Sequence, residues 1–223
     1  MEKWSVESIV IELKKHANPK NVKGMARFGI NPRNTIGIPI PVIRSLAKRI
    51  GKNHELAQDL WNTGIHEARI LAALTDEFGK VTKAQMDRWT ADFDSWDVCD
   101  QVCMNLFDKT PYAHQKAKAW TSDNKEFVRR AGFAMMAALA FHDKKAPDRD
   151  FLQFFPFIEK YADDQHNFVK KAVNWALRQI GKRNSALCKR AIIVAERLKK
   201  RESTSSRWIG SDAFRELSQK KFS

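Results

Sequence analysis

Apolar residues recur along this chain with the three- to four-residue spacing of amphipathic helices. Sustained period-two alternation and runs of Val, Ile and Thr, which indicate strands, are nearly absent. Pro, Gly, Asn and Asp separate the periodic segments, and the short connections favour antiparallel packing of neighbouring helices. We therefore predict an all-α protein, with helices at residues 5–17, 20–28, 41–51, 53–62, 65–78, 82–92, 95–108, 112–120, 124–141, 148–161, 166–181, 185–200 and 211–221.

One short segment occurs twice. Residues 127–131 (Phe-Val-Arg-Arg-Ala) recur 41 residues later as residues 168–172 (Phe-Val-Lys-Lys-Ala), and an Asp precedes both copies at the same distance. A period of about 40–47 residues is typical of HEAT and armadillo repeats, whose stacked helix pairs form a curved solenoid. We predict a curved, right-handed solenoid of antiparallel, HEAT-like helix pairs with a concave basic face. An irregular helical bundle is the alternative.

Two stretches interrupt the helical pattern. Residues 29–41 contain three prolines within ten residues, which exclude a helix there. Residues 201–210 are polar and are predicted to link the rest of the chain to a final helix. A domain boundary would have a separate hydrophobic core on each side, and neither stretch has this pattern. Residues 1–223 are therefore predicted to form a single domain.

The charge is distributed unevenly. Of the formal net charge of +14, the segment from His166 to the C-terminus carries +11, with 15 Lys and Arg against 4 Asp and Glu. The first 165 residues carry the remaining +3. A basic terminal third favours a polyanionic partner, with nucleic acid first and an anionic membrane surface second. A merely solubilising face is the alternative.

Several classes of protein are excluded by missing patterns. No run of 18 apolar residues predicts a transmembrane helix, and the N-terminus lacks a signal pattern, so we expect a cytoplasmic protein. Three cysteines do not form a disulfide framework, no CxxC pair occurs, and Cys99 and Cys103 are predicted to lie in the core. The six histidines never form HxxxH or HExxH, and nucleotide-binding and hydrolase-elbow motifs are absent. We therefore expect no metal and no cofactor.

The predicted helix at residues 95–108 carries a tryptophan and a carboxylate on one face. Trp96 and Asp100 are four residues apart, so their side chains lie one turn from each other. A structural explanation is available as well, because Asp97 and Asp100 would both complement the positive N-terminal end of the helix dipole. For an isolated pair, that explanation is the simpler one.

A second tryptophan lies among cations on the predicted helix at residues 166–181. Trp175 falls near the edge of the apolar stripe, with Lys171 four residues before it and Arg178 three residues after it. Such a tryptophan is either a packing residue or a platform for a sugar or base beside phosphate-binding charges. Arg130 occupies the place of Lys171 in the earlier repeat copy, where a surface salt bridge is the alternative role.

Five motifs occur in order along most of the chain, roughly residues 5–200. They are Met25-Ala26-Arg27-Phe28; Gly37-Ile38-Pro39 through Pro41-Val42-Ile43-Arg44; Trp96-Asp97-Val98-Cys99-Asp100; Asp123-Asn124 with Arg130-Ala131; and Lys171-Ala172-Val173-Asn174-Trp175-Ala176-Leu177-Arg178. The set resembles the DNA alkylation repair family of HEAT-repeat alkylpurine DNA glycosylases. Each motif alone is weak, and the five in order are specific.

The resemblance implies a concave solenoid that cradles double-stranded DNA and excises positively charged N3- or N7-alkylated purines. It implies a catalytic role for Asp100, and it implies that Trp96 and Trp175 frame the sugar of the lesion. Arg130 would hold the DNA backbone near the lesion, and the reaction would need neither a metal nor a base-flipping pocket. Weaker candidates for phosphate contacts are Arg44, Lys170, Lys171 and Arg178.

The chemistry suits these side chains. A cationic alkylated purine leaves without a general acid, so the enzyme must stabilise the developing oxocarbenium ion at C1′ and position water. A carboxylate does both, and an indole face attracts a cationic sugar by about 0.5–2 kcal/mol. An unmodified purine is a poor leaving group, which provides selectivity without a tight base pocket, whereas most base-excising enzymes extrude their target.

One position departs from the family pattern. Phe28, which we assign to the lesion's sugar site together with Trp96 and Trp175, stands where the best-known members carry Tyr, so the aromatic surface is kept and the hydroxyl is lost. This difference keeps two alternatives to a glycosylase open: a non-catalytic DNA- or RNA-binding member with the same fold, and a HEAT-type scaffold for an acidic protein partner. In each case a monomer is expected.

Overall fold

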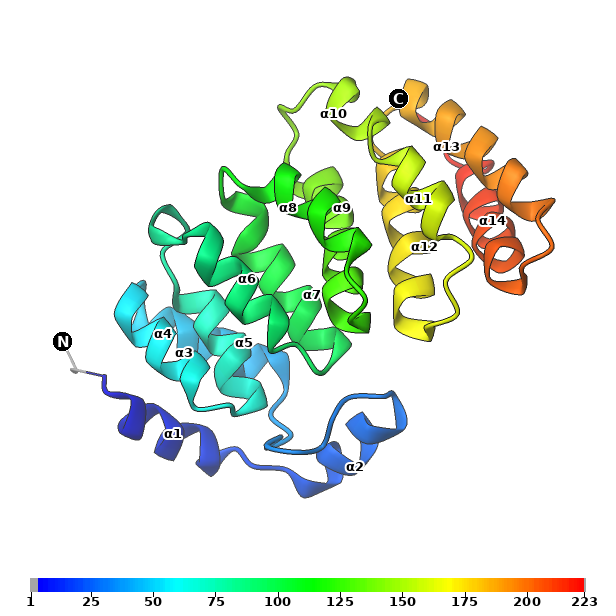
Figure 1. Cartoon of the computed structure of the whole chain (residues 1–223). Coiled ribbons are helices and arrows are strands. Elements are labelled where there is room, and N and C mark those ends of the chain that lie inside the picture. The colour runs from blue at the N-terminus through cyan, green and yellow to red at the C-terminus, as the bar shows by residue number, and fades with distance from the viewer. Residues whose placement is uncertain (1–3, 223) are drawn as a thin grey trace. The chain divides into compact units, whose positions relative to one another are not determined.

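A computed structural model of the protein describes residues 4–222 and contains helices but no strand in that range (Figure 1). The all-α prediction is confirmed. The helices are α1 (Val6–Lys15), α2 (Pro19–Arg27), α3 (Ile40–Ile50), α4 (His54–Asn62), α5 (His66–Thr75), η1 (Phe78–Lys80), α6 (Lys83–Ala91), α7 (Trp96–Asn105), η2 (Phe107–Lys109), α8 (Ala113–Ala119), η3 (Trp120–Ser122), α9 (Glu126–His142), α10 (Asp148–Leu152), α11 (Phe155–Tyr161), α12 (Asn167–Gly181), α13 (Ser185–Lys199) and α14 (Thr204–Leu217).

Two predicted boundaries are wrong, each for a local reason. The single helix predicted at 148–161 is two helices, α10 and α11, because Pro156 lacks an N–H and its ring would collide with the preceding turn. The segment predicted as a linker, 201–210, is helical from Thr204 onward. Ser203 begins α14 as its N-cap, since its side chain accepts a hydrogen bond from the backbone N–H of Ser206 at 3.4 Å.

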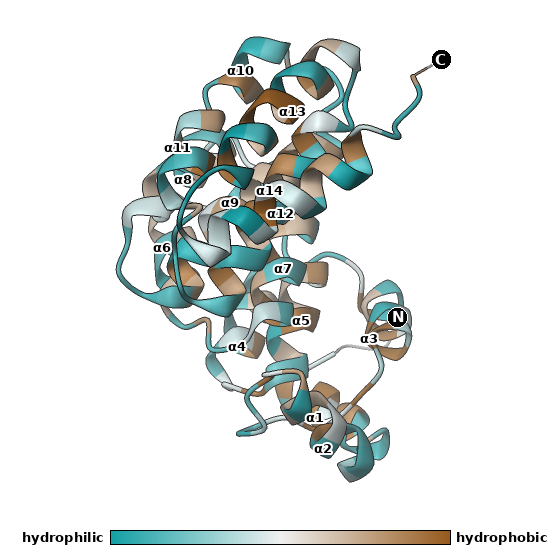
Figure 2. Ribbon diagram, turned by 90° about the vertical axis from the view of Figure 1, so that its right-hand side faces the viewer, coloured by the Kyte–Doolittle hydropathy of each residue, from teal (hydrophilic) through white to brown (hydrophobic). Residues whose placement is uncertain are grey.

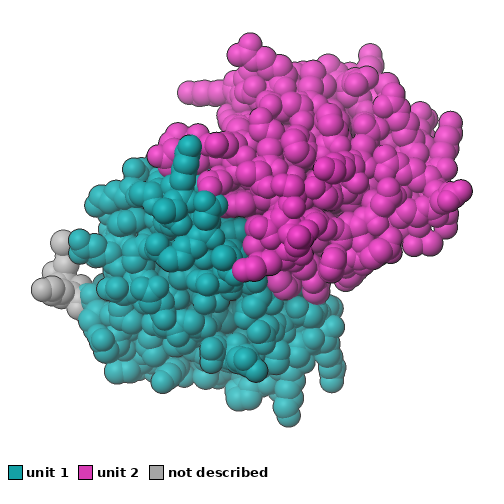
Figure 3. Space-filling model, viewed as in Figure 1, with its two compact units in different colours: residues 1–110 teal, residues 111–223 magenta. Residues whose placement is uncertain are grey.

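The chain falls into two compact units, Met1–Thr110 and Pro111–Ser223 (Figure 3). Each unit has its own buried apolar residues, and the helices of both carry hydrophobic and hydrophilic positions along their length (Figure 2). That residues 1–223 form a single domain, and that they present a concave basic face, remain predictions.

In the first unit, α5 lies at the centre of the packing. It contacts α3 on one side and α7 on the other, and α4 packs against it as the second helix of a pair. The core of this unit includes a pair of stacked aromatic side chains. The indole rings of Trp61 and Trp89 are parallel, with their centroids 4.1 Å apart.

In the second unit, the two repeat copies lie next to each other. Helices α9 and α12 pack side by side, and the rings of Phe127 and Phe168, the first residue of each copy, stack 5.7 Å apart. Helix α14 continues the row beside α12. Helix α8 packs against α9, and α13 packs against α14, as the second helix of each pair. Side chains of α9 and α12 each bond to a residue 38 positions later, Arg130 to Phe168 and Asn174 to Asp212, so such bonds link each helix to the next one in the row.

No helix among residues 4–222 combines the length and the apolar character that crossing a membrane would require.

Close approach of α14 to α13 depends on a glycine. A Cβ added to Gly210 would lie 2.5 Å from the carbonyl oxygen of Ala195 and 2.6 Å from the amide nitrogen of Lys199. We expect Gly210→Ala to lower the free energy of unfolding by about 1–3 kcal/mol, since the helices would have to separate. A Cβ added to Gly24 of α2 would have no atom within 4 Å. Because Ala is a better helix former than Gly, Gly24→Ala should raise the free energy of unfolding by up to about 1 kcal/mol. Urea unfolding of both variants measures the difference, and equal stability of the two would contradict the close packing.

Candidate functional site

The N-terminus of α7 is fixed against the end of α2. The indole Nε1 of Trp96 donates a hydrogen bond to the carbonyl oxygen of Phe28 at 3.0 Å. Ser95, the N-cap residue of α7, accepts a hydrogen bond from the backbone N–H of Asn31 at 2.9 Å. The structure therefore brings together two of the predicted site residues that lie far apart in the sequence. The Trp96 ring is half-buried, whereas the Phe28 ring is 73% exposed.

Asp100 lies one turn after Trp96 on α7 and is half-buried. Burial is the main reason that the pKa of Cys103, on the same helix, is raised; the hydrogen bond and charge of Cys99 raise it further, and so does the charge of Asp100. Cys99 and Cys103 are both fully buried, as predicted, and neither forms a disulfide.

A cavity of about 610 Å³ opens beside Trp96 and Phe28. Its walls are mostly apolar, and six polar or charged side chains join them. The apolar side chains are Met25, Phe28, Ile30, Ile38, Pro39, Ile40, Ile70 and Trp96, and the polar or charged ones are Lys20, Asn21, His66, Glu67, Asp97 and Gln101. This combination, an apolar pocket with a few converging polar groups, is typical of ligand-binding sites.

Two adjacent residues at the start of α5 organise the cavity, and the first is His66. Its Nε2 lies 2.9 Å from Oδ2 of Asp97, and its side chain is 3% exposed. Burial by itself lowers the pKa of His66, but the hydrogen bond and charge of Asp97, with the charges of Glu67 and Asp94, outweigh it and leave the pKa above its ordinary value. Asp97 thus serves as the partner of a buried histidine as well as a first-turn acid of α7.

The second is Glu67, whose buried carboxylate accepts hydrogen bonds from three consecutive backbone N–H groups. These belong to residues 36–38, and the shortest, from Gly37, measures 2.6 Å. Gly37 has a φ of +85°, and a Cβ there would collide with the carbonyl oxygen of Asn18, so only glycine fits. This pair was not predicted from the sequence, because His66-Glu67 matches no motif. The nearby Gly-Ile-Pro segment was the available signal.

In the second unit, Arg130 is 5% exposed, and its Nη1 donates a hydrogen bond to the carbonyl oxygen of Phe168 at 2.6 Å. Trp175 is half-buried on the neighbouring helix α12. Its neighbour Arg178 is paired with acids of α14, at 2.6 Å from Glu216 and 3.4 Å from Asp212.

The other two cations of α12 lie near aromatic rings. The Nζ atom of Lys170 is 5.2 Å from the ring centroid of Trp208, and that of the exposed Lys171 is 6.0 Å from the ring centroid of Phe168. The predicted residues of this unit therefore lie on two adjacent helices. That Trp175 and Asp100, from different units, frame one sugar remains a prediction.

Arg44, the last predicted site residue, is exposed on α3 and lines a separate hollow rather than the cavity beside Trp96. Within the described range, no cluster of three or more His, Cys, Asp or Glu side chains is arranged to hold a metal ion.

Comparison with known proteins agrees with this architecture. A family model described as "DNA alkylation repair enzyme" matches residues 9–217. A solved structure described as "A new family of proteins related to the HEAT-like repeat DNA glycosylases with affinity for branched DNA structures" superimposes with a TM-score of 0.80 at 18% identity, covering 96% of each chain. At that identity the likeness shows the fold, and it confirms the prediction of HEAT-like helix pairs.

A second solved structure, of an engineered protein, aligns with a TM-score of 0.41 at 10% identity over 98% of this chain and all of the other. That score is too low to support any conclusion. The search of curated proteins gave no match.

The ion pair of His66 with Asp97 makes stability depend on pH. Because the folded-state pKa of His66 is raised, the pair's contribution is complete below the unfolded pKa of about 6.5 and is lost as the pH rises through the folded value. We expect the free energy of unfolding to differ between wild type and Asp97→Asn by more at about pH 5.5 than at about pH 8.5. Urea unfolding at both pH values measures this, with the exposed Asp59→Asn as control. A difference that does not change with pH would contradict a charged His66.

Proposed function

The chain belongs to the DNA alkylation repair enzyme family, and from that premise we propose that it excises positively charged N3- or N7-alkylated purines from double-stranded DNA. It would act as a monofunctional glycosylase in base excision repair, as a monomer in the cytoplasm. The observation that carries the proposal is the geometry of α7: Trp96 is anchored to the carbonyl of Phe28, and Asp100 follows one turn later on the same helix.

The role of Asp100 follows from the charge that develops during the reaction. When the bond between the sugar and the alkylated base breaks, the base leaves as a neutral species and positive charge appears on the sugar. The Asp100 carboxylate would stabilise that charge and accept a hydrogen bond from the attacking water. Because the leaving group is already activated by alkylation, no general acid is required and the base need not be extruded.

The role of Trp96 follows from how firmly it is held. Its hydrogen bond to Phe28 and its half-buried ring fix the plane of the indole before DNA arrives, so little conformational entropy is lost when a sugar packs against it. Trp175 of α12 is the proposed counterpart on the other side of the lesion, and the exposed ring of Phe28 adds an aromatic surface nearby.

The cations proposed to contact phosphates differ in their surroundings. Lys171 and Arg44 are exposed and can meet a phosphate directly, whereas Arg178 would have to exchange its acidic partners on α14. Lys170 is half-buried beside Trp208, and Arg130 would act from a buried position that ties α9 to α12. Affinity for DNA should therefore fall steeply with salt.

A second candidate function is DNA binding without excision. Two observations favour it: the similar structure is described as having affinity for branched DNA, and Phe28 lacks the hydroxyl of the family's Tyr. Measurements of base release and of duplex binding separate the two candidates.

Asp100→Asn tests the catalytic role. The variant keeps the shape of the side chain and removes its charge, so we expect loss of about 100-fold or more in the rate of 7-methylguanine release from duplex DNA. Release is scored as abasic sites, and Asp59→Asn, an exposed carboxylate of α4, serves as the control. If wild type binds the duplex but releases no base, the second candidate replaces the first. If it neither binds nor releases, an acidic protein partner becomes the better explanation.

Phe28→Tyr tests the departure from the family pattern. The exposed ring can carry a hydroxyl without steric cost, and one added hydrogen bond to DNA contributes about 0.5–1.5 kcal/mol. We expect up to about tenfold tighter binding of duplex DNA, measured by fluorescence anisotropy. Phe78→Tyr, at a ring that is also exposed, should leave the affinity unchanged. Equal effects of both substitutions would contradict a contact at Phe28.

A further inference from the structure

A hollow of about 360 Å³ lies at the C-terminal ends of α3 and α5, apart from the cavity beside Trp96. Three of the six residues that line it are cations: Arg44, Lys48 and Lys52. None of the six is acidic. Arg44 and Lys48 are one turn apart on α3 and exposed, so their charged ends project over the same side of that helix.

Lys52 supplies a fixed charge to this hollow. Its Nζ donates hydrogen bonds to the carbonyl oxygens of Leu74 and Asp76, each at 2.9 Å, which hold the ammonium in one position. Partial burial and the positive charge of Lys109 lower the pKa of Lys52, while Asp76 and Glu77 act in the opposite direction. Lys109 is thus a fourth cation close to the hollow.

The nearby acids do not neutralise Arg44 and Lys48. The carboxylate of Asp76 is fully buried and is bonded to His54, Gln85 and the backbone of Glu77. Glu77 itself pairs with Lys80 at 3.0 Å. Within the part of the chain that the structure describes, neither Arg44 nor Lys48 has an acid within ion-pair distance.

A purely structural explanation accounts for only part of the cluster. Cations are favourable at helix C-termini, and Lys52 satisfies carbonyl groups at the end of α5 in this way. Arg49, in the last turn of α3, has a structural role on the opposite side, where it pairs with Glu12 at 3.2 Å and lies over the ring of Trp4. Arg44 lies more than one turn before the end of α3, so neither explanation applies to it.

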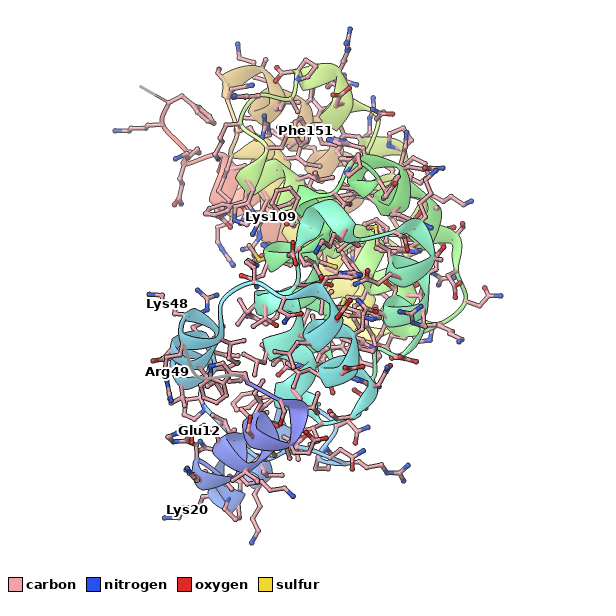
Figure 4. The ribbon with its side chains drawn as sticks, turned by 90° about the vertical axis from the view of Figure 1, so that its left-hand side faces the viewer. Glu12, Lys20, Lys48, Arg49, Lys109 and Phe151 are labelled. Carbon is pink, nitrogen blue, oxygen red and sulfur yellow. The ribbon has the colours of Figure 1, made fainter. Side chains whose placement is uncertain are left out.

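Lys48 and Arg49 separate clearly in space. Lys48 lies on the side of α3 toward Lys109, and Arg49 lies on the side toward Glu12 (Figure 4). Adjacent residues of one helix thus have different surroundings, one in an unneutralised cluster and the other in an ion pair.

We propose that the hollow formed by Arg44, Lys48 and Lys52 binds phosphates of the DNA backbone, as a contact region in the first unit that is separate from the Trp96 cavity. This inference rests on the proposed function, because it takes DNA as the polyanion. Lys52 provides an immobile positive charge, and the exposed Arg44 and Lys48 close on the phosphates without giving up an ion pair. Contacts of this kind hold the duplex in register and carry no base specificity.

The double substitution Arg44→Ala with Lys48→Ala tests the proposal, with Arg49→Ala as the matched control from the same helix. Duplex affinity is measured by fluorescence anisotropy across a salt series. We expect the slope of log K against log salt to become less negative by about 0.9 for each lost phosphate contact, so by about 1.8 for the double variant. Arg49→Ala should keep the wild-type slope. Circular dichroism melting confirms that both proteins fold.

The outcomes are distinguishable. If wild type binds the duplex and the double variant keeps the wild-type slope, the hollow does not contact DNA, while the proposed function stands. If wild type does not bind duplex DNA even at low salt, the proposed function fails and the inference fails with it. Lys48→Glu provides a second variant at an exposed position, and it should weaken binding more than Lys48→Ala because it adds repulsion.

Discussion

The first turn of α5 is the constraint on which the first unit's candidate site depends. Two consecutive buried residues there bind the two neighbouring segments. Glu67 binds the backbone of residues 36–38, and His66 pairs with Asp97 of α7. A buried carboxylate is costly unless its lone pairs are satisfied, and three backbone N–H groups satisfy this one. The arrangement fixes a segment that contains three prolines and cannot form regular hydrogen bonds of its own.

The consequences extend from α5 to the indole ring. The fixed segment binds α2 in turn, because the carbonyl of Ile36 accepts from the backbone N–H of Asn18, and that of Gly37 accepts from the side chain of Asn21 at 2.9 Å. Helix α2 ends at Phe28, whose carbonyl holds Trp96. The aromatic part of the site is therefore positioned by a series of backbone contacts, and a rigid setting of this kind is what preorganised electrostatic catalysis requires.

Many cations of the strongly basic C-terminal third have structural partners within their own unit. Several of its cations are paired with acids of the same unit, as in Arg178 and Lys182 with Glu216. Others lie against aromatic rings, as Lys170 does against Trp208. Cations held in this way tie adjacent helix pairs together. The sequence of the first unit carries a much smaller excess of positive charge, yet Arg44 and Lys48 have no such partners there. The paired cations of the second unit and the unpaired cations of the first unit therefore differ in local neutralisation, which net charge does not reveal.

Much of the fold and part of the site were determined by the sequence alone. Apolar periodicity predicted the all-α class, and the echo between residues 127–131 and 168–172 predicted stacked helix pairs, a packing in which α9 and α12 lie side by side. The spacing of Trp96 and Asp100 placed both on one helix face. Only the tertiary structure decided the contacts of Trp96 with Phe28, of His66 with Asp97, and of Glu67 with residues 36–38. These pairs are separated by about 30 to 70 residues and depend on how helices pack, which local periodicity does not encode.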